Sequence, residues 1–382
     1  MTRVFFIAGE PSGDRLGAAL MAGLRELEPG VVFAGVGGGG MVSEGLESLF
    51  PMSELSIMGL VEVLPKYRHL KRRIAETARA VLEMAPDVLI TIDSPDFCLR
   101  VAKTVRAERP SQRVVHYVAP SVWAWRPGRA AKMAPIVDQV LALLPFEPPY
   151  MEAAGMRCDF VGHPVAAAPV ATAAERQAFR DRAGLGEAPF LVVLPGSRQG
   201  EIARLAPRFG AALRLLGRDL PVVVPTLPNL EGRLSAEVAR WPGATQVLVL
   251  DEAEKRAAFG AATAALAASG TVSLELAAAG TPMAIAYDVN PLTRAIAARL
   301  LKIDTFTLVN LITETRTVPE CMGKACTPDT IARTLAEVLD APGVQQAALA
   351  QAMDLLGRGA EAPGRRAARA VLEGLAAQAR GC

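Results

Sequence analysis

"VFFIAGEPSGDRLGAAL" (Val4–Leu20) and "FLVVLPGSRQGEIARL" (Phe190–Leu205) decide the fold, because both stretches have the same order of parts. Each begins with a short apolar run, passes through a glycine turn and continues as an amphipathic segment. The apolar run predicts a buried strand, the glycine marks a turn, and the amphipathic segment predicts a helix. A strand–turn–helix unit therefore opens each half of the chain.

Further apolar runs follow each opening unit, and helical stretches separate most of them. The predicted strands of the first half are Val31–Gly38, Asp87–Asp93, Arg113–Ala119 and Gln139–Pro145, and those of the second half are Leu220–Thr226, Thr245–Asp251, Ala264–Ser269 and Pro282–Asp288. Strands that alternate with helices predict a parallel sheet covered on both faces. We expect an α/β fold of two Rossmann-like parallel-sheet domains that face each other across a cleft, with ligands beyond the carboxyl ends of the strands.

Composition excludes several classes of protein. The chain has 382 residues, which favours two domains, and its net charge of +2 leaves no basic excess for binding nucleic acid. The five cysteines and three histidines are scattered without the spacing of metal ligands, so we expect no metal and a reduced, cytoplasmic compartment. The first apolar run is too short for a signal peptide, and no apolar run is long enough to span a bilayer.

A candidate nucleotide site lies in the second half. Ser269, Gly270 and Thr271 stand before an Ala/Leu-rich helix, and Glu275 is a lone carboxylate about one turn into it. A hydroxyl there suits a helix cap, and the free N–H groups and dipole of a helix N-terminus attract phosphate. One interpretation is a nucleotide with its diphosphate at the turn and its ribose on Glu275. The other is a capped helix with an acid near its positive end.

Arg198, beside Ser197, lies at the tip of the turn that opens the second half. Its guanidinium can hold a diphosphate with two parallel hydrogen bonds and stabilise the leaving charge, or it can form a salt bridge between domains. Neither opening turn contains a GxGxxG fingerprint or a P-loop, and Gly35–Gly40 predicts only a flexible glycine loop. The nucleotide hypothesis therefore depends on the second half.

Asp93 is the candidate general base. It ends a predicted strand, ahead of a helix that we expect Ser94 to cap and Pro95 to begin. Asp96 is explained by the first turn of that helix, whereas Asp93 remains at the carboxyl edge of the sheet, facing the cleft.

Two further segments of the first half carry candidate polar groups. Glu10, Ser12 and Asp14 on the first turn either face the same cleft or cap a helix. The loop within His116–Arg129 contains two tryptophans and two arginines, which can hold an amphipathic ligand with a phosphate or simply pack. His116 itself is predicted to be a core residue.

Several stretches, in order and over most of the chain, resemble the family of lipid-A-disaccharide synthases. They are "AGEPSGDRLGA", "SIMGLVEVLP", "ITIDSPDF", "HYVAPSVWAWRPGR", "LALLPFE", "VGHP", "LPGSRQGE", "AASGTVSLELAAAGTPM" and "LVNLI". The resemblance implies a GT-B fold and a hexosyltransferase that works by inversion without metal or other cofactor. The implied donor is UDP-2,3-diacylglucosamine and the acceptor 2,3-diacylglucosamine 1-phosphate, giving lipid A disaccharide 1-phosphate and UDP.

The resemblance also implies roles for single residues. Asp93 matches the base for the acceptor 6-hydroxyl, Arg198 the arginine on the donor diphosphate, and Glu275 the ribose-binding glutamate. Polar positions important for activity are matched by Glu10, Ser12 and Asn310. The chain departs from the family at Met41, where a proline is expected after the glycine run, and this affects the expected rigidity of the glycine loop. It departs again at Val309, where a proline is expected before Asn310.

The expected domains follow from the restart of the strand–helix pattern after the Ala- and Pro-rich stretch Gly162–Phe179, together with the resemblance. An acceptor and membrane-facing domain covers 1–165, a UDP-sugar donor domain covers 166–344, and helices from about 345 to 382 pack back on the first domain or exchange with a partner in a homodimer. We expect a peripheral protein on the cytoplasmic face of the inner membrane. The expected lipid surface is Ser56–Arg73, where an apolar group stands next to basic residues. The alternative is an ordinary amphipathic helix.

Two other functions fit the fold. One is another GT-B enzyme of UDP-sugars, such as a GlcNAc transferase or an epimerase. The other is a nucleotide-sugar binding protein without turnover. Release of UDP that depends on an acylated acceptor distinguishes the transferase from both.

Overall fold

A computed structural model describes residues 1–55, 60–290 and 303–381, with only the backbone for residues 60–67 and 381. The chain divides into two compact units. Unit 1 consists of Met1–Ala167 and Gly359–Cys382, and unit 2 consists of Ala168–Arg358. Both contain a six-stranded parallel sheet, as the alternating pattern of strands and helices predicts.

The sheet of unit 1 has the order β2-β1-β3-β4-β5-β6. Its strands are β1 (Arg3–Ala8), β2 (Val32–Val36), β3 (Val88–Ile92), β4 (Val114–Tyr117), β5 (Gln139–Ala142) and β6 (Arg157–Phe160). Its helices are α1 (Pro11–Leu27), α2 (Gly39–Ser43), α3 (Leu60–Met84), α4 (Pro95–Glu108), α5 (Gly128–Met133), α6 (Pro148–Glu152), α7 (Pro164–Ala167) and α17 (Pro363–Gly381). The strand order reverses between β1 and β3, so their following loops separate to opposite faces of the sheet and leave a crevice at that edge.

The sheet of unit 2 has the order β12-β11-β10-β7-β8-β9. Its strands are β7 (Leu191–Leu194), β8 (Val222–Thr226), β9 (Thr245–Val249), β10 (Ala264–Ala267), β11 (Met283–Tyr287) and β12 (Glu320–Met322). The described helices are α8 (Ala173–Arg182), α9 (Gln199–Leu216), α10 (Glu231–Val238), α11 (Glu252–Ala261), α12 (Val272–Ala279), α14 (Leu308–Thr313), α15 (Pro328–Asp340) and α16 (Gln346–Leu355). This is the Rossmann order, and its switch point lies between β7 and β10.

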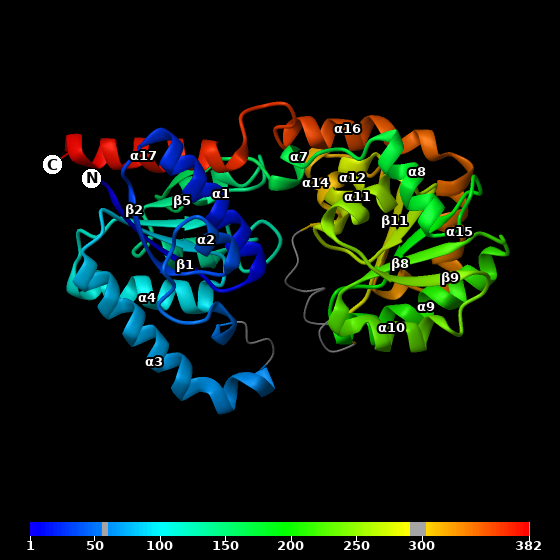
Figure 1. Cartoon of the computed structure of the whole chain (residues 1–382), viewed down its shortest axis with the longest axis horizontal. Helices are drawn as coiled ribbons and strands as arrows, with labels where there is room; N and C mark the ends of the chain where they lie inside the picture. Colours follow the sequence, from blue (N-terminus) through cyan, green and yellow to red (C-terminus); the bar gives the residue numbers. More distant parts are fainter. Residues whose placement is uncertain (56–59, 291–302, 382) are drawn as a thin grey trace. The chain divides into compact units, whose positions relative to one another are not determined.

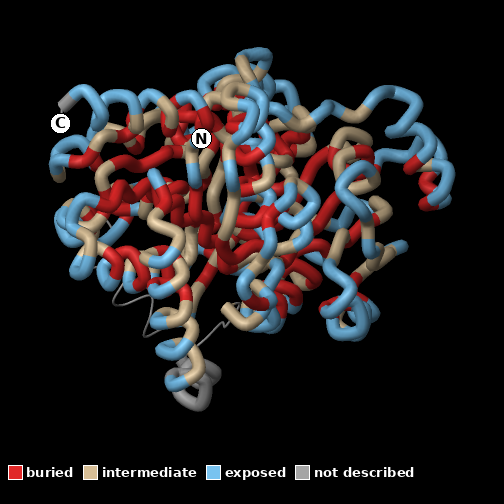
Figure 2. Tube along the Cα trace, turned by 60° about the vertical axis from the view of Figure 1, so that its left-hand side comes forward, coloured by how far each residue is buried: buried red, intermediate tan, exposed pale blue. Residues whose placement is uncertain are grey.

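The strands are the core of each unit. The five residues of β3 and the four of β10 are all buried, because helices cover both faces of a parallel sheet. Figure 2 shows buried residues along the strands and on the inward sides of the helices, with the exposed positions on the outer turns. Each predicted strand is present, and most are shorter than predicted. The short strands β6 and β12 are additional to the prediction.

The C-terminal helix α17 packs on α1 of the same chain (Figure 1). Glycines allow this contact to be very close, because a Cβ on Gly364 would lie 2.4 Å from the carbonyl oxygen of Ala19. Helix α16 instead packs on α12 and α14 of unit 2. The segment that returns to unit 1 therefore begins at Gly359 and not near residue 345.

The glycine loop is not simply a flexible connection. The Asp14 carboxylate is buried and accepts hydrogen bonds from the backbone N–H groups of Gly38, Gly40 and Met41 at 2.8 to 3.0 Å. Asp14 therefore holds the start of α2, rather than capping its own helix α1. His116 is buried, as predicted, with its Nδ1 atom 2.8 Å from the Thr91 hydroxyl.

Glu147, which follows β5, is a buried carboxyl group. It accepts a hydrogen bond from the Leu144 N–H at 3.0 Å and a longer one from Trp123 Nε1 at 3.4 Å. Burial outweighs these bonds and raises the pKa of Glu147 to about 7.

This pKa predicts a pH-dependent stability. Between the ordinary glutamate pKa and 7, the folded chain keeps a proton that the unfolded chain has released, so stability falls as pH rises through that window. Because Glu147→Gln cannot ionise, its stability relative to the unmodified protein should rise by on the order of 2 kcal/mol from pH 5 to pH 8. Urea denaturation at both pH values measures the change. The exposed Glu152→Gln is the control, and parallel pH curves for Glu147→Gln and the native chain would contradict the assignment.

Candidate active site

A pocket of about 490 Å³ lies at the switch point of unit 2, beyond the carboxyl ends of β7 and β10. The two strands are paired in register, with Leu194 opposite Ala267, so the turns that follow them begin side by side. The sequence-predicted residues that line the pocket are Ser197, Arg198, Ser269, Gly270, Thr271 and Glu275. Apolar residues line it as well, among them Leu227, Leu230, Leu250 and Phe259.

The N-terminus of α12 is open to this pocket. We expected a hydroxyl to cap it, but the Thr271 side chain at the cap position forms no capping hydrogen bond. The Ser273 hydroxyl instead donates to the carbonyl of Gly270. A Cβ on Gly270 would meet no atom within 4 Å, so the space in front of this turn is empty of protein. The uncapped N–H groups and the helix dipole together suit an anion.

The turn that carries Arg198 is braced from behind by Glu201. The Glu201 carboxylate accepts the Ser197 N–H at 3.0 Å and the Tyr287 hydroxyl at 3.1 Å, and Arg198 Nη1 lies 3.6 Å from it. Gly196 is required in this turn because its φ is +117° and a Cβ there would lie 2.5 Å from Glu201 Cβ. The Arg198 side chain itself remains 64% exposed, so its guanidinium is available to a ligand.

Glu275 has a partner that the sequence pattern did not indicate. Lys255 on α11 places its Nζ 2.9 Å from Glu275 Oε2 and 3.0 Å from Glu252 Oε2. All three residues line the pocket. Three residues, Glu201, Tyr287 and Lys255, were not predicted from the sequence, because each looks like an ordinary polar residue in its own local sequence. Only Glu201 had a local signal, since it lies three positions after Arg198.

Asn310 is not among the residues that line this pocket. Its side chain is buried, accepts the Val318 N–H at 3.0 Å, and donates to the Val318 carbonyl at 2.8 Å and the Thr305 hydroxyl at 3.2 Å. These bonds use the amide to hold its own loop. The Asn310 side chain therefore anchors this loop, and its contact with a nucleotide stays a prediction.

In unit 1 the backbone is strained at the carboxyl edge of the sheet. Asp93, Ser94 and Val118 have φ values of +49°, +41° and +83°, and they follow the adjacent strands β3 and β4. Positive φ is costly for such residues and clusters at functional sites. Ser94 occupies the cap position of α4 but forms no side-chain cap bond, contrary to our expectation.

Glu10 and Ser12 come to this same edge from β1, which pairs with β3 so that Ala8 lies opposite Ile92. The turns that follow β1 and β3 are in contact, because a Cβ on Gly9 would lie 2.6 Å from the Ser94 hydroxyl. The switch point of unit 1 therefore gathers Glu10, Ser12 and Asp93 on neighbouring turns.

The two tryptophans of the neighbouring loop differ in environment. Trp123 packs edge-on against Phe146 at 5.2 Å and donates to the buried Glu147, so it serves packing. Trp125 is 40% exposed, and the Arg126 guanidinium stacks over its ring at 4.3 Å. The exposed aromatic and its cation remain available to a ligand.

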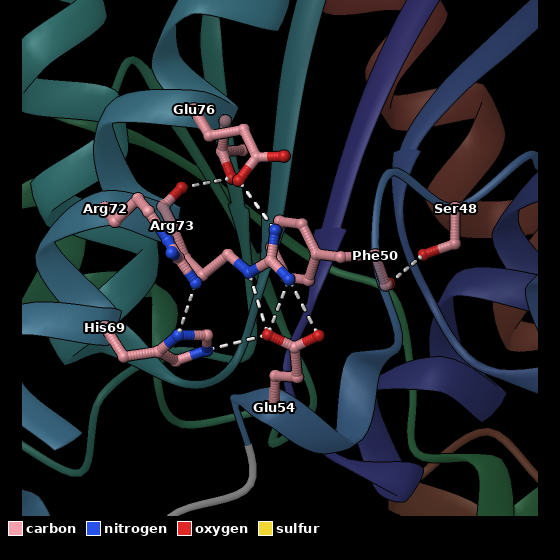
Figure 3. A network of polar contacts seen from close by, with 8 residues as sticks. Ser48, Phe50, Glu54, His69, Arg72, Arg73 and Glu76 are labelled. Carbon is pink, nitrogen blue, oxygen red and sulfur yellow. Dashed lines mark hydrogen bonds and ion pairs between the residues drawn. The ribbon is translucent and has the colours of Figure 1, made fainter.

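Part of the expected lipid surface is an internal polar network (Figure 3). Arg73 forms a paired contact with both oxygens of Glu54, bonds Glu76 at 2.7 Å and lies 4.3 Å over the Phe50 ring. His69 also bonds Glu54, at 2.7 Å. Arg73 is therefore engaged within the protein, and our assignment of it to a lipid surface is wrong.

The rest of that surface is only partly described. Arg68, Lys71 and Arg72 are exposed on α3. The other residues of the expected patch lie outside the described residues or side chains; they are Met58, Leu60, Val61, Val63, Leu64, Lys66 and Tyr67.

Sequence comparison decides the family. The profile of the family described as lipid-A-disaccharide synthetase matches residues 4–366. The lipid-A-disaccharide synthase of Ruegeria pomeroyi is 65% identical over 98% of this chain and 96% of its own length. The chain belongs to the lipid-A-disaccharide synthase family. As a member of this family it is a glycosyltransferase of lipid A biosynthesis.

Solved structures agree with the family on the fold. A glycosyltransferase from Rickettsia africae matches with a TM-score of 0.64 at 12% identity, over 100% of this chain and 99% of the other. A UDP-GlcNAc 2-epimerase from Neisseria meningitidis, bound to UDP-GlcNAc, matches with a TM-score of 0.62 at 10% identity, over 98% and 100% of the two chains. The predicted GT-B fold is confirmed.

The described residues also bear on metal binding and on membrane spanning. No group of three or more His, Cys, Asp or Glu side chains among them is placed to hold a metal ion. Within the same ranges, none of the helices combines the length and the apolar character needed to cross a membrane.

The brace behind Arg198 predicts a kinetic effect in this family member. Tyr287→Phe removes the hydroxyl that bonds Glu201 while preserving the ring. Loss of a hydrogen bond to a charged group costs roughly 1.5–3 kcal/mol, and we expect kcat to fall about tenfold with a smaller change in donor KM. Steady-state kinetics measures both constants. Tyr150→Phe, on an exposed side chain of unit 1, is the matched control. A Tyr287→Phe variant as active as the control would show that the brace is dispensable.

Proposed function

We propose that the protein transfers 2,3-diacylglucosamine from UDP-2,3-diacylglucosamine to the 6-hydroxyl of 2,3-diacylglucosamine 1-phosphate, with inversion at the anomeric carbon. The products are lipid A disaccharide 1-phosphate and UDP. The observation that carries the proposal is the pocket of unit 2, where an uncapped helix N-terminus, an exposed arginine and a carboxylate line one cavity. Those three groups match the diphosphate and the ribose of a UDP-sugar.

The donor binds in unit 2. Its diphosphate lies at Ser269, Gly270 and Thr271, where the N–H groups of α12 point outward, and Arg198 neutralises charge on the departing UDP. The ribose hydroxyls donate to Glu275, which keeps one oxygen for them while the other bonds Lys255. The apolar part of the pocket, including Leu227 and Phe259, binds the uracil ring of UDP.

The acceptor binds at the carboxyl edge of the unit 1 sheet. Asp93 removes the proton from its 6-hydroxyl as the oxygen attacks the anomeric carbon. Glu10 and Ser12, on the turn beside Asp93, bind or orient the sugar. Arg126, held over the exposed Trp125 ring, binds the acceptor phosphate. A single displacement by one oxygen inverts the anomeric configuration.

Both substrates carry acyl chains, so the protein works at a membrane, and we assign it to the cytoplasmic face of the inner membrane as a peripheral protein. Lys71 and Arg72 of α3 are exposed cations suited to anionic headgroups. A homodimer is compatible with this arrangement.

The reaction is tested by mass spectrometry of the product formed from defined acylated sugars. The expected product has the mass of the disaccharide 1-phosphate, and UDP appears only when the acylated acceptor is present. Release of UDP without acceptor, or formation of an epimerised donor, would assign the site to another GT-B activity. Binding of UDP without any turnover would assign it to a nucleotide-sugar binding protein.

Asp93→Asn tests the base. The amide cannot accept the proton, so kcat should fall by at least about 100-fold, the usual scale for a general base. UDP affinity should stay within a few-fold, because Asp93 belongs to unit 1 and the UDP pocket to unit 2. Single-turnover kinetics and calorimetry give the two values. Near-normal turnover in this variant removes Asp93 from the role.

Glu275→Ala tests the ribose contact. Loss of a hydrogen bond to a charged acceptor costs roughly 1.5–3 kcal/mol, so UDP binding should weaken by tens-fold. Calorimetry with UDP measures the change. If the variant binds UDP as tightly as the unmodified protein, Glu275 does not bind the ribose and is only an acid near the helix N-terminus.

A further inference from the structure

The pocket of unit 2 presents an electrostatic conflict if, as proposed above, it binds a diphosphate. Three carboxylates line it, those of Glu201, Glu252 and Glu275. Glu275 stands in the first turn of α12, the helix whose N-terminus would hold the phosphates. The negative charge of these carboxylates repels the negative charge of the phosphates, and partial removal from water strengthens the repulsion. A carboxylate that binds the ribose therefore opposes the phosphates attached to that ribose.

Lys255 is the side chain placed to resolve this conflict. Its ammonium lies 2.9 Å from the Glu275 carboxylate and 3.0 Å from that of Glu252. The side chain is only 24% exposed. Burial opposes its charge, but the two carboxylates, Glu275 above all, outweigh burial and raise the pKa of Lys255. The ammonium therefore stays charged within the pocket wall.

On its own helix Lys255 has a partner, Glu252, three positions earlier at 3.0 Å. Helix α11 is capped by Asp251, with Glu252 and Glu254 in its first turn, and Lys255 directly follows them. The first turn of a helix favours anions and disfavours cations, because the dipole is positive there. Lys255 lies next to the positive end of the α11 dipole, which is unfavourable for a cation, and its ammonium contacts Glu275 on the neighbouring helix α12.

We propose that Lys255 is a positioning and charge-compensating residue, which cancels the charge of Glu275 and thereby makes the pocket selective for nucleoside diphosphates over uncharged nucleosides. The inference rests on the proposed function, since it assumes that a uridine nucleotide binds here. It adds to the preference for a diphosphate that the turn at Gly270 and Arg198 provide. Lys255 acts on the ligand through the charge state of the Glu275 site, and the ribose bonds themselves remain with Glu275.

The test is the ratio of the affinities for UDP and for uridine, measured by calorimetry on the full chain. Packing or folding defects weaken both ligands and cancel in the ratio, whereas charge compensation affects the charged ligand alone. Lys255→Met should lower the ratio about tenfold, because an uncompensated carboxylate then faces the diphosphate. Lys255→Arg should retain most of the native ratio, because it keeps the charge.

Two further variants complete the charge series. Glu275→Gln should weaken both ligands and raise the ratio, because it removes the repelling charge. The double variant Lys255→Met with Glu275→Gln should return the ratio to near the native value. Lys324→Met, which replaces an exposed lysine of unit 2 that does not line the pocket, should leave the ratio unchanged.

The outcomes separate this inference from the function on which it rests. If the unmodified protein binds UDP more tightly than uridine, and Lys255→Met weakens both ligands by the same factor, the inference is overturned while the proposed function stands. If the unmodified protein binds no UDP, the proposed function is overturned and the inference falls with it.

Discussion

The parallel pairing of β7 with β10 is the constraint on which the donor site depends. Backbone hydrogen bonds between these strands set Leu194 opposite Ala267, so both strands end at the same level of the sheet. The chain leaves them in opposite directions, because the strand order reverses there. The turn with Arg198 and the open end of α12 consequently border one pocket, although about 70 residues of sequence separate them. In unit 1 the pairing of β1 with β3 places the turns of Glu10 and Asp93 together in the same way.

The polar groups of the pocket are held by other polar groups. Glu201 fixes the turn before Arg198 and is itself held by Tyr287, and Lys255 compensates Glu275. Such partners reduce the motion that a ligand would otherwise have to restrict, so more of the interaction energy is available for binding and for charge that develops in the transition state. In unit 1 the backbone at Asp93 and Val118 is strained, because both residues have a positive φ that such residues rarely adopt.

The sequence predicts features that depend on local order along the chain. Asp93 directly follows a strand, Arg198 lies in the turn after one, and Glu275 stands in the first turn of the helix after another. Their positions near the carboxyl edges could therefore be predicted from the pattern, together with the two-sheet fold. Features that depend on tertiary contacts could not be predicted. Lys255, Tyr287 and the ion pair of Arg73 with Glu54 join separate elements, and the buried Asn310 side chain bonds Val318. The expected caps at Ser94 and Thr271 failed because the hydroxyls do not reach the N–H groups.

The central claim is that the end of α12 and Glu275 receive the diphosphate and the ribose of UDP. The most direct measurement is a crystal structure of the protein grown with UDP. The account predicts phosphate oxygens within hydrogen-bonding distance of the N–H groups at Gly270 and Thr271, Arg198 on the diphosphate, and the ribose hydroxyls on Glu275. UDP bound with its base at this helix end, or bound outside the pocket, would contradict it.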